Sequence, residues 1–224
     1  MKILSINPNV FQIDITDPKF ITLVIENKSF YWKFSKYLYD TFPEHLSYCS
    51  LIKNGEQQKI EDVSAYIFNP FDLNLNTKQN LNALYKILKK SYFTELSASV
   101  QQIQDLLTQV CKEIRLDFDA ELTMESSIRI DDIFKIGGLQ FLETDSSLLE
   151  RFVRYISIVK ELQNVSIIFI NHLHDYFENA EIEQLLKEME YRGITLVNIE
   201  TFVPQNKLEN ETICIIDKDL CSIN

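Results

Sequence analysis

The segment Val165-Ser166-Ile167-Ile168-Phe169-Ile170 decides the fold class of this chain. It is apolar on both faces, as parallel strands covered by helices tend to be. Helical spacing over residues 182–191 stops at Gly193, and another apolar strand is predicted over 194–199. These elements make a β-α-β unit, and one further strand is predicted over 212–216. The C-terminal part is therefore expected to form an α/β sheet.

The N-terminal part is predicted to add strands to the same domain. Asn54-Gly55 is a strong signal for a hairpin turn between two short strands. The other predicted strands cover residues 2–6, 11–15, 21–25 and 65–68. Helical spacing over 28–42 places Phe30, Phe34 and Leu38 on one face. The aromatic side chains of this helix, Phe30, Tyr31, Trp32 and Phe34, are expected to pack inside the protein rather than to stack on nucleic-acid bases.

A long helical segment begins near residue 77. Its first apolar face consists of Leu81, Leu84, Leu88 and Tyr92, and a second, with steps of three and four residues, consists of Val100, Ile103, Leu107, Val110 and Ile114. These two faces predict an antiparallel helical hairpin, followed by a short helix that ends at Gly137-Gly138. The predicted α/β head therefore combines residues 1–76 with 146–224, and a helical insertion spans 77–145.

Glycine content excludes the common nucleotide sites. The chain has only four glycines, so neither G-x-G-x-x-G nor G-x-x-x-x-G-K-[ST] occurs, and no G-x-S-x-G elbow exists. The four cysteines are far apart, which fits reduced thiols in a cytosol better than a disulfide or zinc framework. No apolar run reaches the roughly 18 to 20 residues needed to cross a bilayer. We therefore expect a cytoplasmic protein.

The net charge of −11 argues against a generic nucleic-acid binder, but the charge is unevenly distributed. Residues 1–112 contain 12 basic and 11 acidic groups, whereas residues 113–224 contain 10 and 22. Because the Debye length is only about 8 Å at physiological salt, a local group of lysines can still hold a polyanion.

An acidic segment in the insertion has the carboxylate density that hard cations need. It contains Asp117, Asp119, Glu121 and Glu125. It is not an EF-hand, because Leu122 stands where that loop needs glycine. A solvated acidic face at the end of a helix is the alternative interpretation.

A second metal-like pattern follows the strand that decides the fold. His172-x-His174-Asp175 is similar to the start of a metallohydrolase motif, but the aspartate is one position early and the terminal histidine is missing. A catalytic metal site normally needs three protein ligands. An ordinary loop at the end of a strand is the expected structure.

Basic residues near turns are the candidate contacts to nucleic acid. Lys53 and Lys59 flank the Asn54-Gly55 turn, and Arg129 and Lys135 adjoin the acidic segment. A further group, Lys86, Lys89 and Lys90, is expected to be a solvated helix face.

The order of elements resembles one family, the small accessory protein of spacer acquisition in type II-A CRISPR systems. The resemblance extends over nearly the whole chain. It rests on Ile21-Thr22-Leu23-Val24-Ile25-Glu26, on Phe71-Asp72-Leu73-Asn74, on the acidic segment up to Ile136-Gly137-Gly138-Leu139, and on Val165-Ser166-Ile167-Ile168-Phe169-Ile170-Asn171.

This resemblance implies a homotetrameric ring of α/β heads with a degenerate nucleotide-binding-like sheet. Such a ring is non-enzymatic and binds the ends of double-stranded DNA without sequence preference. The resemblance also implies Ca²⁺ bound by Asp117, Asp119, Glu121 and Glu125. Lys53, Lys59, Arg129 and Lys135 are then the candidate contacts to DNA. The implied partners are the CRISPR integrase, its small structural partner and the type II effector nuclease.

Two other functions stay open on the residues alone. One is a metal-dependent phosphodiesterase or nuclease that uses the acidic segment or His172, His174 and Asp175. The other is a protein-interaction scaffold that never contacts nucleic acid.

Overall fold

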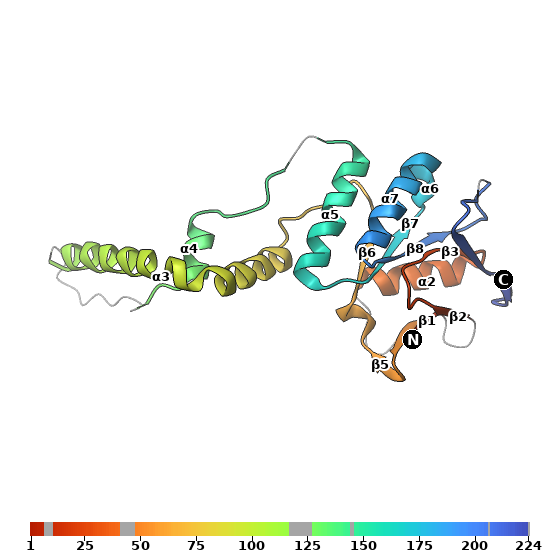
Figure 1. Ribbon diagram of the computed structural model, residues 1–224, viewed down its shortest axis with the longest axis horizontal. Helices are drawn as coiled ribbons and strands as arrows, with labels where there is room; N and C mark the ends of the chain where they lie inside the picture. The colour runs from red at the N-terminus through yellow and green to blue at the C-terminus, as the bar shows by residue number, and fades with distance from the viewer. Residues whose placement is uncertain (7–10, 41–47, 117–126, 144–145, 206, 224) are drawn as a thin grey trace. The chain divides into compact units, whose positions relative to one another are not determined.

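The computed structural model describes residues 1–6, 11–40, 48–116, 127–143, 146–205 and 207–223. The chain divides into two compact units (Figure 1). Met1–Asn74 and Asp145–Asn224 form the first, which we call the head unit, and Leu75–Thr144 form the second, the helical unit. The predicted mixed α/β fold with a helical insertion is confirmed.

The head unit is built on a six-stranded sheet with the order β10-β9-β3-β8-β7-β6. All neighbouring strands are parallel except β10, which pairs antiparallel with β9. The strands are β3 (Phe20–Ile25), β6 (Ser64–Ile67), β7 (Ile167–Asn171), β8 (Thr195–Glu200), β9 (Glu211–Ile216) and β10 (Ser222–Ile223). Strand β10 was not predicted from the sequence.

Strand β7 is buried along its whole length because both faces of the sheet are covered. Its Ile168 and Ile170 pack with α5 (Leu148–Gln163) and α7 (Asn179–Tyr191) on one face. Its Ile167 and Phe169 belong to the core on the other face, beneath α2 (Lys28–Tyr39). A four-residue helix, α6 (Leu173–Tyr176), follows the strand directly.

A small antiparallel sheet completes the second face of the head unit. Its order is β2-β1-β4-β5, and the short 3-10 helix η1 (Ile60–Asp62) follows it. Its strands are β1 (Lys2–Ile6), β2 (Phe11–Asp14), β4 (Cys49–Lys53) and β5 (Glu56–Gln58). Between β4 and β5, Asn54 and Gly55 both have positive φ, of 54° and 86°, so the predicted hairpin turn is confirmed.

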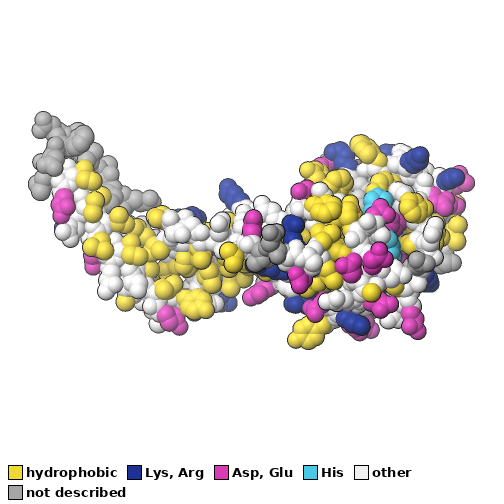
Figure 2. Space-filling model, turned by 90° about the horizontal axis from the view of Figure 1, so that it is seen from above, with side chains coloured by type: hydrophobic (Ala, Val, Ile, Leu, Met, Phe, Trp, Pro, Cys, Tyr) yellow, Lys and Arg dark blue, Asp and Glu magenta, His cyan; other side chains and the backbone are white. Residues whose placement is uncertain are grey.

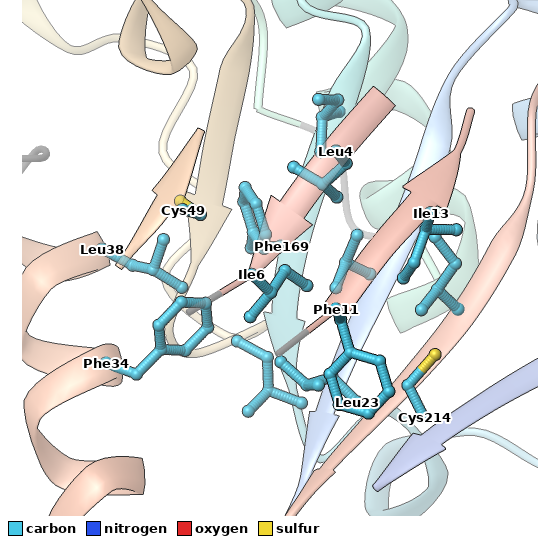
Figure 3. Packing of buried hydrophobic residues seen from close by; sticks show 14 of the residues in the cluster. Leu4, Ile6, Phe11, Ile13, Leu23, Phe34, Leu38, Cys49, Phe169 and Cys214 are labelled. Atoms are coloured by element: carbon cyan, nitrogen blue, oxygen red, sulfur yellow. The ribbon is translucent and has the colours of Figure 1, made fainter. Parts of the chain in front are cut away.

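Helix α2 fixes the small sheet to the large one through aromatic packing. Figure 3 shows Phe34 and Leu38 of α2 beside Ile6 of β1 and Phe169 of β7. The rings of Phe34 and Phe169 meet edge to face, with centroids 6.4 Å apart. This contact joins α2 and β7, two elements that are far apart in the sequence.

The helical unit does not contain the predicted antiparallel hairpin. Instead α3 (Lys78–Leu116) spans 39 residues as two helical segments that continue into each other across a kink at Tyr92, where the backbone angles are non-helical. The prediction was wrong because no glycine or proline lies between the two apolar faces to start a turn. The short helix α4 (Ile130–Ile136) packs on α3, with Phe134 5.7 Å from Tyr85 between ring centroids.

We predict that Phe34→Ala lowers the free energy of unfolding of the head unit by about 3–5 kcal/mol, because it removes a fully buried ring. Lys33→Ala, at the neighbouring exposed position, should change it by less than about 0.5 kcal/mol. Urea unfolding of both variants measures the difference. Equal stabilities would contradict the packing of α2.

Candidate functional site

Three lysines of the head unit meet at one place on its surface. The register between β1 and β4 places Lys2 directly opposite Lys53. Lys160 lies in the last turn of α5. The Lys2 ammonium donates a hydrogen bond to Ser166 Oγ, at 2.7 Å, just before β7. We call Lys2, Lys53, Lys160 and Ser166 the basic cluster.

The positive charges of the three lysines in the basic cluster repel one another. Burial lowers the pKa of Lys2, and the charges of Lys53 and Lys160 lower it further. Burial also lowers the pKa of Lys160. Within the described residues, no acidic side chain forms a salt bridge with any of the three lysines.

Stabilisation within the fold accounts for the position of Lys160 but not for the pairing of Lys2 with Lys53. The C-terminal end of α5 favours a cation such as Lys160 through the helix dipole. That effect gives no reason for Lys2 and Lys53 to face each other across two strands, where like charges are destabilising. An anion bound among the three ammonium groups would relieve this repulsion, and a phosphate is the anion that lysines commonly hold.

Sequence reasoning found Lys53 but missed Lys2 and Lys160. The other hairpin candidate, Lys59, comes directly before η1, and its Nζ is 3.9 Å from a carboxylate oxygen of Glu61. Lys59 therefore has a salt-bridge partner, whereas Lys53 lies opposite Glu56 in the β4–β5 register and forms no salt bridge with a described residue.

Arg129 and Lys135 belong to an ion-pair network in the helical unit. Arg129 Nε is 2.9 Å from Asp132 Oδ2, and Lys135 Nζ is 3.5 Å from Asp132 Oδ1. Lys135 also approaches Asp131 at 3.7 Å, and Lys89 of α3 approaches Asp131 at 3.3 Å. The hydrogen bond from Arg129 lowers the pKa of Asp132 to about 2. Three cations thus share two carboxylates, which leaves this network less free charge than the basic cluster.

The predicted calcium ligands Asp117, Asp119, Glu121 and Glu125 lie outside the described residues. Within the described part of the chain, no group of three or more His, Cys, Asp or Glu side chains is placed to hold a metal ion.

His172 and His174 face two different buried carboxylates. His172 Nδ1 is 3.0 Å from Glu200 Oε2, at the end of β8, and its Nε2 is 2.9 Å from the Tyr31 hydroxyl. His174 Nε2 is 3.4 Å from Glu211 Oε1, and Thr22 donates a hydrogen bond to the same carboxylate. The structure does not bring the two histidines together with Asp175 as one metal site.

These histidine–glutamate pairs tie α6 to the sheet. The hydrogen bonds to Glu200 and Glu211 raise the pKa of His172 and His174, respectively. Burial acts to raise the pKa of Glu211, but the hydrogen bonds from His174 and Thr22 outweigh it and the pKa is lowered. Sequence reasoning missed both glutamates, although a charged residue at the end of an apolar strand was the available signal.

Comparison with protein families gives one match for this chain. The model for CRISPR-associated protein (Cas_Csn2) matches residues 42–220. The chain belongs to the Csn2 family. No individual curated protein matches it significantly.

Membership of the Csn2 family confirms the resemblance drawn from the sequence and establishes a CRISPR-associated role. The matched range of this Csn2 protein includes Lys53, Lys160 and Ser166 of the basic cluster, whereas Lys2 lies outside it. Among the described helices, none has the length and apolar character to cross a membrane.

We predict that this Csn2 protein loses stability as pH rises through the raised pKa values of His172 and His174. The protonated imidazoles stabilise the fold fully below the ordinary value of 6.5, and this contribution disappears above the raised values. Ionised Glu211 contributes above its ordinary value of 4.5 and stops contributing as pH falls through its lowered value. Stability should therefore be highest between these two limits.

Thermal unfolding of the wild type and of His174→Gln, from pH 4 to pH 9, tests this. The variant should lose stability at low pH and show a smaller decline between pH 6.5 and pH 8.5. A parallel decline in both proteins would contradict the assignment to His174.

Proposed function

We propose that this Csn2 family member is a non-enzymatic protein that binds double-stranded DNA, at its ends and without sequence preference, during CRISPR spacer acquisition. The basic cluster carries this proposal, because its three lysines form no salt bridge with the acids of the described chain. Ammonium groups contact phosphates without reading bases, so binding through them is independent of sequence. The family match supports the role in CRISPR.

An exposed apolar face on the helical unit supports the second part of the proposal, a homotetrameric ring. Side chains of α3 remain exposed on the face with three- and four-residue spacing, including Leu107 at 36% and Val110 at 48%, and the adjacent Leu106 is 63% exposed. Together with Ile133 and Ile136 they line an apolar cleft of about 390 Å³. Hydrophobic side chains are visible along much of this unit in Figure 2. A second copy of the chain, which offers the same apolar face, is the proposed occupant.

A closed ring reconciles DNA binding with a net charge of −11. Several copies of the basic cluster facing one hole would create a strong local field. Acidic groups farther away than a Debye length of about 8 Å are screened from the DNA. The net charge of the whole chain is therefore a poor guide to its local affinity for phosphate.

Calcium and protein partners complete the proposal. The carboxylates of Asp117, Asp119, Glu121 and Glu125 suit a hard cation, and we propose that they bind Ca²⁺ in the helical unit. The proposed partners are the CRISPR integrase, its small structural partner and the type II effector nuclease, in the cytoplasm.

We predict that replacing Lys2 and Lys53 together by Met weakens binding to a linear duplex. Because two phosphate contacts are lost, the slope of log affinity against log salt should fall by about two. Lys187→Met, at an exposed position of α7, is the control and should bind like the wild type. Fluorescence anisotropy of labelled duplexes at several salt concentrations gives both slopes.

If the double variant kept the wild-type affinity and salt slope, the basic cluster would not be part of the DNA interface. Covalently closed circles of the same sequence should bind more weakly than the linear duplex, since a ring needs an end to thread. Equal affinity for circles would argue against a ring around DNA.

We predict that Leu106→Asp together with Val110→Asp lowers the mass of the protein in solution, because charges on this face oppose its burial. Lys112→Gln changes an exposed residue elsewhere on α3 and should leave the mass unchanged. Light scattering in calcium and in chelator measures both effects. A wild-type monomer under both conditions would contradict the ring.

A further inference from the structure

The exposed face of α2 presents aromatic rings and lysines in one row. Lys28, Trp32, Lys36 and Tyr39 are all exposed. At 3.6 residues per turn, these four positions fall within a stripe about 80° wide on the helix surface. The expectation that Trp32 packs inside was therefore wrong, because Phe30 and the other core residues of α2 lie on the opposite side.

The exposed fractions of these rings are large for aromatic residues. Trp32 is 61% exposed and Tyr39 is 67% exposed. Phe68, which directly follows β6, is 57% exposed and meets Tyr39 edge to face with ring centroids 5.8 Å apart. The far side of Phe68 is supported by Tyr66, at 6.2 Å. We call Trp32, Tyr39 and Phe68, with Lys28 and Lys36, the α2 face.

The charge of the α2 face restricts the ligand. Residues 28–40 contain three lysines and one acid, in a chain whose net charge is −11. The acid, Asp40, forms an ion pair with Lys36, so Lys28 and Lys33 add positive charge that no salt bridge with a described residue offsets. Aromatic rings alternating with cations provide stacking for bases together with contacts for phosphates, which is the combination found in single-strand binders.

We propose that the α2 face binds unpaired nucleotides of a DNA end, with bases stacked on Trp32 and Tyr39 and a phosphate held by Lys28. The distance between the two ring-bearing positions, seven residues apart, is about 10 Å along the helix axis. The inference rests on the proposed function in taking DNA as the ligand. It goes beyond it, because the basic cluster contacts phosphates alone whereas this face contacts bases.

Trp32 is the only tryptophan of the chain, so its fluorescence reports directly on the α2 face. The probes are a blunt duplex and the same duplex with an unpaired overhang of a few nucleotides. We expect the overhang to quench Trp32 and the blunt duplex to leave its emission almost unchanged. Quenching that is equal for both probes would overturn the proposal.

Variants test the same point by anisotropy of labelled DNA. Trp32→Ala with Tyr39→Ala should weaken binding of the overhang probe about fivefold to a hundredfold, while binding of the blunt duplex stays as in the wild type. Trp32→Phe with Tyr39→Phe keeps both rings and should restore most of the affinity. Tyr191→Ala removes another exposed ring of the head unit, 86% exposed, and is the matched control.

The remaining outcomes separate this inference from the proposed function. If the wild type did not bind the blunt duplex but the overhang still quenched Trp32, duplex binding would be refuted. Binding of unpaired nucleotides by the α2 face would be supported. A change in Trp32 emission on dilution of the protein without DNA would instead make this face an interface between copies and overturn the proposal.

Discussion

Burial of β7 on both faces is the constraint on which the rest of the head unit depends. Since Ile168 and Ile170 point to one side and Ile167 and Phe169 to the other, neither side can be left to solvent. One side is covered by α5 and α7, and the other by α2 and the small sheet. The same strand positions the polar groups at its two ends. Ser166 precedes it within the basic cluster, and His172 follows it beside Glu200.

Much of the fold was predictable because hydrophobic periodicity reports which side of an element is buried. The helical period also indicates on which side of α2 Trp32 lies, because this position is about 160–200° around the helix from Phe30 and Phe34. Reasoning from aromatic character alone placed it in the core, and the helical period would have placed it outside. The helical hairpin failed for a different reason. A seam with three- and four-residue spacing shows that a helix has an apolar face, but not what covers that face.

The candidate site was only partly predictable, because tertiary contacts assemble it. A turn signal in the sequence identified Lys53, but the cross-strand register brings Lys2 opposite it and the packing of α5 brings Lys160 nearby. Arg129 and Lys135 illustrate the opposite case. They pair with Asp131 and Asp132, which lie two to four residues away in the sequence. The sequence alone therefore indicated that nearby carboxylates would offset the charges of Arg129 and Lys135.

The head unit has a mostly parallel sheet with a helix directly after the inner strand β3, but that turn lacks the glycine-rich phosphate loop of nucleotide-binding folds. Such folds hold phosphate at the N-terminus of the helix that follows a central strand, through free backbone N–H groups and glycines. Here α2 follows β3 after two residues, neither of them glycine, and the Asn27 side chain accepts a hydrogen bond from the Phe30 N–H. With that donor occupied and no glycine in the turn, the proposed contacts to anions are side chains rather than a backbone loop. In the proposed function these side chains are the lysines of the basic cluster, on the small sheet and at the end of α5. The proposed ligand of these lysines is accordingly a polyanion such as DNA, whose phosphates require no glycine-rich loop.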